Sequence, residues 1–485
     1  MSKDDPSQRV SSGLNELDTV LSGGYIPRST YLIRGGPGQG KTTLGLHFLT
    51  AAAPTEGSLF IGFQETEEQL RSNAASVGID VAGVRFLSLA PDEQFFINQE
   101  SYDIFSAADV ETDPIVAAVT QAVDAVAPQR VFVDSMTQLR FLSADTFQYR
   151  KLVLSFLRYF RDRGATVLFS SESSSELPDE DLQFIADGVI TLGSDRDGSW
   201  LEVTKYRGSG FRRGRHQVRV GARGLEVFPR PLPPRTEVSV SERTQWTSGM
   251  GRLDEMLHGG LEAGTVTLIT GPSGTGKSTL AAMFAAEAAK RGRKAGLFAF
   301  EEEISSLLQR CERLSIPLRQ AVNDNLALLE QVEPMRYLGD EFTLNVQDLV
   351  EREGVDLVVL DSIAGYELTL GDSENAKASL HAMAKTLARN GVTVILVNEV
   401  EAVTGQFQVS ERGISYLADN VILLRYVETG RMLQKVIGVL KKRMSGFDRR
   451  LLTFDVGPSR FTIHEPEGEL HGVLSGLQLP TNSLD

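Results

Sequence analysis

The sequence contains a single cysteine, Cys311, among its 485 residues. One thiol excludes an intramolecular disulfide framework and any zinc site built from several cysteines. The six histidines are scattered along the chain, which argues against a histidine-rich metal site. No apolar run approaches the roughly 20 residues that span a bilayer, and the polar residues 1–10 lack the apolar core of a signal peptide. We therefore expect a cytoplasmic protein that does not associate with membranes.

Basic residues are also in the minority, with 49 Lys and Arg against 64 Asp and Glu, which gives a formal net charge of −15. A field of that sign repels phosphates, so extensive binding of nucleic acid is disfavoured unless a local basic patch compensates. Hydrophobic residues make up 41% of the chain, which is ordinary for a globular protein and too apolar for wholesale disorder. At one domain per ~150 residues, the length alone suggests about three domains.

What the sequence does have is internal repetition. The segment SGLNELD at 12–18 returns as SGMGRLD at 248–254, and GKTTL at 40–44 returns as GKSTL at 276–280. Both pairs lie 236 residues apart (248 − 12 and 276 − 40). The chain is therefore a tandem duplication with two large units instead of three domains.

Prolines at 229, 231, 233 and 234 mark the seam between the two copies. Proline lacks an N–H and fixes φ, so this stretch is predicted to be a stiff extended linker and not a helix or a central strand. We expect a first domain at 1–228, a linker at 229–241, a second domain at 242–464 and a C-terminal tail at 465–485.

Within each copy, short apolar runs alternate with helical patterns, such as the helix expected at 41–53. Buried strands separated by helices predict an α/β fold whose mostly parallel sheet is flanked by helices. The expected strands lie at 30–34, 58–63, 130–134, 165–170 and 188–192 in the first copy and at 266–270, 295–300, 357–361, 392–397 and 420–424 in the second.

Two segments fit the phosphate-binding pattern G-x-x-x-x-G-K-[ST], namely 35–42 and 271–278. Backbone N–H groups must curl closely around a phosphate, which glycine permits, and the next helix points its positive N-terminal end at the same anion. Each match lies between an expected strand and an expected helix, which argues against a glycine turn with a chance lysine. The expected ATP-binding residues of these loops are Gly36, Pro37, Gly38, Gln39, Gly40, Lys41, Thr42, Thr43, Gly271, Pro272, Ser273, Gly274, Thr275, Gly276, Lys277, Ser278 and Thr279.

A magnesium ion normally accompanies a nucleotide in such a loop. The hydroxyls of Thr42 and Ser278 are placed to ligate it, while the loop lysines reach the β- and γ-phosphates. Asp134 and Asp361 end apolar strands downstream, where a Walker-B carboxylate holds the metal through a water. An aspartate that only forms a turn is the alternative, but the duplication favours metal binding.

Transfer of a phosphoryl group also needs a residue that orients and deprotonates the nucleophile. Carboxylates follow the second expected strand of each copy, and the local register pairs Gln64 with Glu301 and Glu65 with Glu302. An amide positions water but does not take its proton, so the halves are predicted to be chemically unequal. A solvated acidic helix start is the alternative. The expected catalytic residues are Lys41, Glu65, Lys277, Glu301 and Glu302.

The double strand–phosphate loop–helix unit, the Ser-Gly-x-x-x-Leu-Asp entry and the Phe-x-Glu step resemble the KaiC family of tandem RecA-like ATPases. The resemblance extends from about Ser12 to about Phe461. It implies two RecA-like P-loop domains, ATP and Mg²⁺ as cofactors, ATP hydrolysis, and a homohexameric ring with ATP between neighbouring subunits. It also implies a nucleotide-driven signalling or timing switch and a KaiB-like protein as partner.

The resemblance extends to a Lys-x-Arg motif that contacts the γ-phosphate of a neighbouring subunit in this family. Its members here are Lys205 with Arg207 and Lys441 with Arg443, 236 residues apart. Such a cation stabilises charge on the transferring phosphoryl group. A basic strand edge that discourages aggregation is the alternative. The family's following glycine is replaced by Met444 in the second copy.

The family's second domain phosphorylates itself on an adjacent Ser-Thr pair before a final apolar strand. Here Ser415 matches the serine and Tyr416 replaces the threonine. The resemblance therefore implies a serine autokinase with Ser415 as acceptor and Tyr416 as a second candidate. An ordinary surface serine is the alternative.

Two other functions are compatible with the phosphate loops. A RecA/RadA-like nucleic-acid-dependent ATPase requires a basic, aromatic-lined channel, and the net charge of −15 argues against it. A signalling scaffold would use nucleotide only for assembly, and Gln64 favours that function for the first copy.

Overall fold

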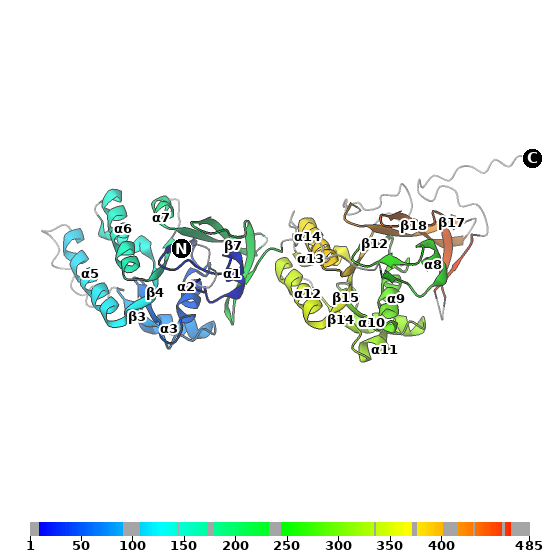
Figure 1. Ribbon diagram of the computed structural model, residues 1–485, viewed down its shortest axis with the longest axis horizontal. Coiled ribbons are helices and arrows are strands. Elements are labelled where there is room, and N and C mark those ends of the chain that lie inside the picture. Colours follow the sequence, from blue (N-terminus) through cyan, green and yellow to red (C-terminus); the bar gives the residue numbers. More distant parts are fainter. Residues whose placement is uncertain are drawn as a thin grey trace, which may run out of the picture. The chain divides into compact units, whose positions relative to one another are not determined.

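The computed structural model describes residues 9–90, 107–143, 145–172, 179–196, 198–231, 244–333, 336–370, 376–400, 416–429, 432–457 and 461–466. The chain divides into two compact units, Met1–Arg230 and Pro231–Asp485 (Figure 1). Most of the expected linker and nearly all of the expected tail lie outside the described residues, so the domain limits drawn from the sequence stay predictions.

The first unit is built on a nine-stranded sheet in the order β3-β2-β4-β5-β1-β6-β7-β8-β9. The strands from β3 to β6 run parallel, and β7, β8 and β9 extend the sheet antiparallel. The strands are β1 Thr30–Gly35, β2 Gly57–Gly62, β3 Arg85–Ser88, β4 Pro128–Asp134, β5 Thr166–Glu172, β6 Gly188–Asp195, β7 Gly198–Tyr206, β8 Arg215–Gly221 and β9 Gly224–Phe228. The helices are α1 Asn15–Val20, α2 Lys41–Thr50, α3 Glu67–Ser76, α5 Ala107–Val126, the 3₁₀ helix η2 Met136–Leu142, α6 Thr146–Asp162 and α7 Glu180–Ile185.

The second unit repeats this topology strand for strand, in the order β14-β13-β15-β16-β12-β17-β18-β19-β20. A small antiparallel pair, β10 Gln245–Trp246 with β11 Leu261–Glu262, is added to it. The main strands are β12 Val266–Gly271, β13 Lys294–Ala299, β14 Ala327–Gln331, β15 Val355–Asp361, β16 Thr393–Glu399, β17 Asn420–Thr429, β18 Met432–Lys442, β19 Leu452–Val456 and β20 Phe461–His464. The helices are α8 Gly251–Met256, α9 Lys277–Lys290, α10 Ile304–Arg313, α11 Leu318–Asn323, α12 Gly339–Glu353, α13 Ile363–Leu370 and α14 Ala376–Arg389.

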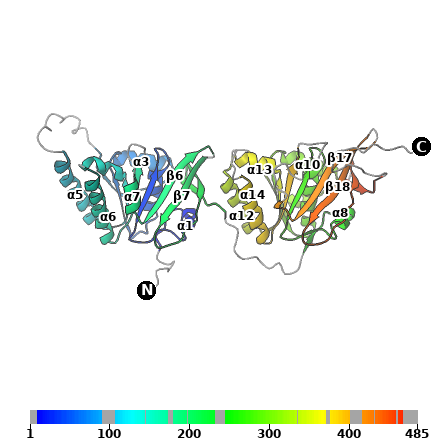
Figure 2. The ribbon, with the colours of Figure 1, turned by 90° about the horizontal axis from the view of Figure 1, so that it is seen from above.

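Helices cover both faces of each sheet (Figures 1 and 2) because the central strands are apolar on both sides. In β1, Tyr31 and Ile33 pack with α1, α2 and α3, whereas Leu32 packs with α5, α6 and α7. In β12, Ile269 packs with α8–α11 and Leu268 with α12–α14. Each unit therefore has two hydrophobic layers that hold the sheet between them.

All ten expected strands are present, and the expectation of a mostly parallel α/β fold is confirmed. The sequence did not predict the edge strands β3 and β14 or the antiparallel extensions β7–β9 and β18–β20. β3 has only four residues and is exposed at both ends, so it presents no buried apolar run. The helix expected at 41–53 ends at Thr50, because Pro54 disfavours the helical conformation in the residue before it.

Acid is expected to weaken the packing of α2 through His47. Its Nε2 accepts a hydrogen bond from the backbone N–H of Leu225 at 3.0 Å, and burial lowers the pKa of His47. The unfolded chain therefore takes up a proton below about pH 6.5 while the folded chain resists it, so this stabilisation is lost as pH falls. Met283 stands at the matching place in α9 (47 + 236). Thermal unfolding between about pH 7.5 and about pH 5.5 is expected to be less pH-dependent in His47→Met than in the parent; equal slopes would contradict this role.

Candidate functional site

The two phosphate loops join the carboxyl ends of β1 and β12 to the helices α2 and α9. Gly40 and Gly276 are the N-cap residues of these helices, with φ of 88° and 101° in the left-handed region that glycine adopts readily. The backbone N–H groups at both helix starts thus face the carboxyl edge of the sheet, where an anion is stabilised. The seventeen residues expected to bind ATP in these segments lie in the two loops and in the first three residues of α2 and α9.

The lysine of each loop is folded back onto its own loop. Lys41 donates hydrogen bonds to the carbonyl oxygens of Gly35 and Gly36 at 2.8 and 2.7 Å. Lys277 donates to the carbonyl oxygen of Pro272 at 2.8 Å and lies 3.4 Å from the carboxylate of Glu399. Both lysines are largely buried, and burial lowers the pKa of each. Each lysine is thus held by backbone carbonyl groups of its own loop and is largely shielded from solvent.

Different side chains close the two loops. Gln39 accepts a hydrogen bond from the backbone N–H of Gly36 at 2.7 Å, whereas the hydroxyl of Thr275 donates to the carbonyl oxygen of Pro272 at 2.8 Å. In the first loop, a phosphate that takes the Gly36 N–H must therefore displace the Gln39 side chain.

The expected magnesium ligands lie together at the carboxyl ends of β4 and β15. The hydroxyl of Thr42 donates to Asp134 Oδ2 at 2.5 Å, and Ser170 on β5 donates to the other oxygen of the same carboxylate. In the second unit, burial raises the pKa of Asp361 to about 6, although a hydrogen bond from Ser278 acts in the opposite direction. Asp361 therefore holds a proton more tightly than an aspartate in solvent does.

These donor sets fit a magnesium ion that is shared with a nucleotide. Each site offers one hydroxyl and one carboxylate, which are hard oxygen ligands, and waters and phosphate oxygens would supply the remaining ligands that Mg²⁺ prefers. No group of three or more His, Cys, Asp and Glu side chains among the described residues is arranged to hold a metal by protein ligands alone.

The structure places the carboxylates that follow β2 and β13 in the expected register. The backbone N–H of Phe63 donates to the carbonyl oxygen of Asp134 at 3.1 Å, and that of Phe300 donates to Asp361 at 2.8 Å. Gln64 therefore corresponds to Glu301, and the two halves differ chemically at this position.

In the first unit, Gln64 donates from its amide to the carboxylate of Glu172 at 3.1 Å. Glu65 accepts one hydrogen bond at Oε1, from the side-chain amide of Asn73 at 3.2 Å. Burial raises the pKa of Glu65, and the charge of nearby Asp134 raises it further. Glu65 is thus a carboxylate of enhanced basicity beside the expected metal ligand.

In the second unit, Glu301 accepts a hydrogen bond from the hydroxyl of Ser362 at 2.8 Å. Glu302 is held differently: both of its oxygens accept from the guanidinium of Arg310, at 2.6 and 2.8 Å. No motif in the sequence marks Asn73 or Arg310. Each follows its glutamate by eight residues and lies on α3 or α10. The contact forms because the helix packs against the end of the strand, which the spacing alone does not indicate.

The Lys-x-Arg pairs lie at the opposite end of the sheet from their own phosphate loop. Lys205 pairs across β6 and β7 with Val189, next to Gly188, which pairs with Tyr31 at the start of β1. Val189 itself pairs with Leu32, three residues before the loop begins at Gly35, so Lys205 is separated from the loop by about 10 Å along the strand, at ~3.3 Å per residue. The register of β12, β17 and β18 repeats this arrangement.

These cations are bound to groups of their own unit. Lys205 donates to the carbonyl oxygen of Gln183 at 2.7 Å, and Lys441 donates to that of Ala418 at 2.6 Å. Arg207 lies 3.7 Å from Asp187, and Arg443 lies 3.3 Å from Asp419. Arg207 and Arg443 are about half exposed, so both guanidinium groups face outward.

Of the two expected phosphoacceptors, Ser415 lies outside the described residues. Tyr416 is 60% exposed, and its ring centroid lies 5.9 Å from that of His381 on α14. Tyr416 therefore lies largely on the surface of the second unit.

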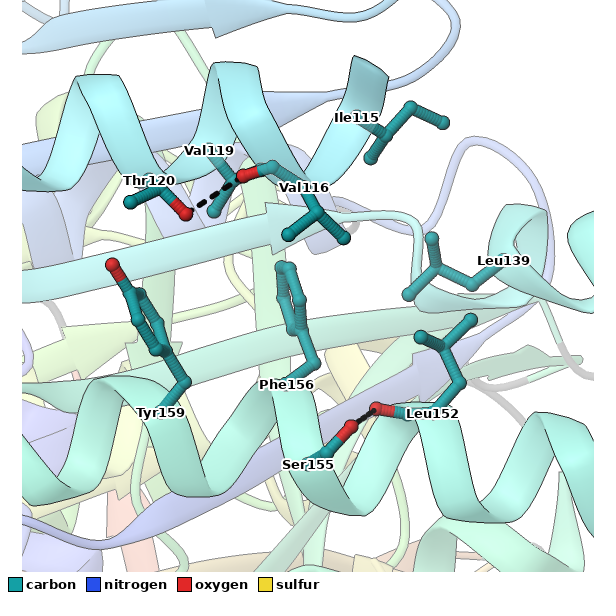
Figure 3. A pocket seen from close by; sticks show the side chains of 9 residues that line it. All are labelled: Ile115, Val116, Val119, Thr120, Leu139, Leu152, Ser155, Phe156 and Tyr159. Atoms are coloured by element: carbon teal, nitrogen blue, oxygen red, sulfur yellow. Dashed lines mark hydrogen bonds between the residues drawn. The ribbon is translucent and has the colours of Figure 1, made fainter. Parts of the chain in front are cut away.

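A separate apolar cavity of about 240 Å³ lies in the first unit between α5, η2 and α6. Figure 3 shows its lining side chains, including Val116, Leu139 and Phe156. No phosphate-loop, metal-site or Lys-x-Arg residue lines it, so it is distinct from the nucleotide site.

Comparisons with known proteins agree with this geometry. A family model described as "ATPase: KaiC" matches residues 10–231 and 246–468. The circadian clock oscillator protein KaiC of Parasynechococcus marenigrum (strain WH8102) is 25% identical, over 97% of this chain and 93% of its own length. The protein of the same name from Prochlorococcus marinus (strain MIT 9313) is 24% identical, over 97% of this chain and 95% of its own length. That of Synechococcus elongatus (strain ATCC 33912 / PCC 7942 / FACHB-805) is 25% identical, over 95% of this chain and 90% of its own length. The resemblance to tandem RecA-like P-loop ATPases is confirmed. Within the described part of the chain, no helix has the length and apolar character to cross a membrane.

Proposed function

The chain belongs to the KaiC ATPase family over both of its repeats, and from that premise we propose that it is a homohexameric ATPase whose second unit is also a serine autokinase. It binds ATP with Mg²⁺ in both units and acts as a nucleotide-driven signalling or timing switch with a KaiB-like protein as partner. The observation that carries this proposal is the duplicated site: a buried loop lysine, a hydroxyl–aspartate pair and carboxylates after the second strand converge at one sheet edge in each unit.

Bound Mg²⁺ would neutralise charge on the β- and γ-phosphates, with Thr42 or Ser278 as direct ligand and Asp134 or Asp361 through water. The loop lysine leaves its carbonyl partners and pairs with phosphate oxygens. A carboxylate accepts the proton of the attacking water as the water oxygen bonds to the γ-phosphorus. The bond from that phosphorus to the bridging β-oxygen breaks, ADP and phosphate leave, and the proton passes to solvent.

The autokinase follows the same course with a protein hydroxyl as nucleophile. The oxygen of Ser415 attacks the γ-phosphorus, ADP leaves, and the hydroxyl proton passes to a carboxylate that follows β13. Tyr416 is the second candidate, because its ring is exposed at the same segment. The acceptor comes from the same or the neighbouring subunit.

Incubation of the purified chain with γ-labelled ATP tests both activities. We expect release of labelled phosphate and label on Ser415. Lys277→Ala should abolish the label on protein, and Lys41→Ala with Lys277→Ala should abolish turnover, because each lysine pairs with phosphate oxygens. Turnover that persists in the double variant would refute the ATPase, and absence of phosphoserine at Ser415 would refute the autokinase. ATPase rates should stay flat on addition of single-stranded DNA or RNA; stimulation would favour the RecA/RadA-like alternative.

A further inference from the structure

The two units differ in the side chains that follow the second strand and in the residue that contacts them. After β2 the chain has Gln64-Glu65, and after β13 it has Glu301-Glu302, in matching register. The residue eight positions beyond the second member differs as well: Asn73 on α3 and Arg310 on α10 occupy the same place (310 − 73 = 302 − 65 = 237). Both contact that second glutamate.

In the second unit, the contact involves both oxygens of the Glu302 carboxylate. Arg310 donates from both terminal nitrogens to the two oxygens of Glu302, at 2.6 and 2.8 Å, in the fork geometry of a strong charge-assisted pair. The side chain of Glu302 is 29% exposed and that of Arg310 is 36% exposed. A proton delivered to Glu302 would have to break this ion pair. Glu301 accepts a hydrogen bond from the Ser362 hydroxyl at one of its oxygens, and its side chain is exposed.

The contact in the first unit leaves the carboxylate available. The neutral amide of Asn73 donates once to Glu65 Oε1, at 3.2 Å. The other oxygen of Glu65 takes no hydrogen bond from the described residues. Gln64, in the place of Glu301, is an amide and does not accept a proton.

We propose that the residue eight positions after Glu65 or Glu302, on α3 or α10, selects the proton acceptor of each unit. The ion pair with Arg310 keeps Glu302 from accepting a proton, so Glu301 is the proton acceptor of the second unit. The hydrogen bond from the neutral amide of Asn73 leaves Glu65 able to accept a proton, which compensates for the amide at Gln64. Arg310 and Asn73 are positioning residues. The inference rests on the proposed ATPase activity, and it implies that the first unit is not silenced by its glutamine.

Rescue in the second unit tests this selection. In a Lys41→Ala chain, which isolates turnover by the second unit, Glu301→Gln should lower kcat at least ~100-fold, the usual contribution of a general base. Adding Arg310→Asn should restore at least ~10-fold of that loss, because Glu302 is then released. Adding Glu302→Gln to this pair should remove the restored activity. A misfolded variant does not regain turnover, so rescue distinguishes positioning from a structural role. A rate for Glu301→Gln/Arg310→Asn equal to that of Glu301→Gln would overturn the proposal.

The first unit supplies the reciprocal test, in a Lys277→Ala chain. Asn73→Arg should lower kcat at least ~10-fold by pairing with Glu65, and Gln64→Glu added to Asn73→Arg should restore it. Unchanged turnover in Asn73→Arg, with binding of a fluorescent ATP analogue intact, would also overturn the selection. If neither parental chain hydrolyses ATP, the proposed ATPase fails and this inference with it; if both do but the substitutions neither rescue nor silence, only the inference fails.

Discussion

Two variants of the chain that are each inactive at the second unit are expected to regain ATP turnover there when they are mixed. The first variant lacks the loop lysine (Lys277→Ala) and the second lacks the cations of the Lys-x-Arg motif (Lys441→Ala/Arg443→Ala). The reason is geometric: the motif lies at the far end of the sheet from its own phosphate loop and faces outward. A cation that acts on the γ-phosphate must then come from another subunit, where such a residue contributes about 10³–10⁵-fold in rate.

The mixing experiment needs turnover by the second unit alone, so both partners also carry Lys41→Ala. Random assembly at equal concentrations places an intact loop against an intact motif at about a quarter of the interfaces, and turnover should approach that share of the parental rate. Light scattering with ATP and Mg²⁺ establishes that both variants assemble. If mixing restores nothing although mixed rings form, the motif does not act in trans.

Removal of one buried charge is expected to destabilise the second unit by about 3–5 kcal/mol. The side chains of Lys442 and Glu262 are almost completely buried and lie 2.9 Å apart, and Lys442 also donates to Ser445 at 2.6 Å. Burial alone would raise the pKa of Glu262, but its interactions with Ser445 and Lys442 outweigh burial, and the pKa is lowered. Lys442→Met would leave Glu262 as an uncompensated buried carboxylate.

The duplicated fold supplies the control for this prediction. The matching residues of the first unit are Ile26 and Tyr206 (262 − 236 and 442 − 236). The hydroxyl of Tyr206 donates a hydrogen bond to the carbonyl oxygen of Gly24 at 2.6 Å. Glu262→Ile combined with Lys442→Tyr should recover most of the stability that Lys442→Met loses, because no charge is left buried.

Urea unfolding measures both variants in a background that reports on the second unit only. The chain has two tryptophans, one in each unit, so Trp200→Phe leaves Trp246, buried in β10 beside β11, as the single reporter. A loss below about 1 kcal/mol in Lys442→Met would show that the pair does not stabilise the unit.

The sequence predicts the nucleotide site best where the chemistry is local. A phosphate loop needs glycines, a lysine and a hydroxyl within eight consecutive positions, and the strand before it and the helix after it are strongly patterned. Asp134 and Asp361 were likewise identifiable, because each ends an apolar run and recurs in the second copy. The structure brings both to the loop hydroxyls, as expected.

Features that depend on packing between distant segments were not predictable in the same way. The pairing of Arg310 with Glu302 requires α10 to lie against the end of β13, and nothing in the spacing alone separates it from a solvated ion pair. The location of Lys205 depends on the antiparallel register of β6 and β7. The strands β7 to β9 were missed because polar and apolar residues are mixed along them, unlike the continuous apolar runs of the parallel strands.

The phosphate loop and the Lys-x-Arg pair lie at opposite ends of one sheet, so two different faces of each unit carry them. In a closed ring, contacts made in this way are head-to-tail, since each subunit presents its loop to one neighbour and its cations to the other. In the proposed ring, the nucleotide in a given loop would therefore contact the neighbour on one side only. A conformational change that follows hydrolysis would then pass around the proposed ring in one direction, which is fixed by the fold of the subunit.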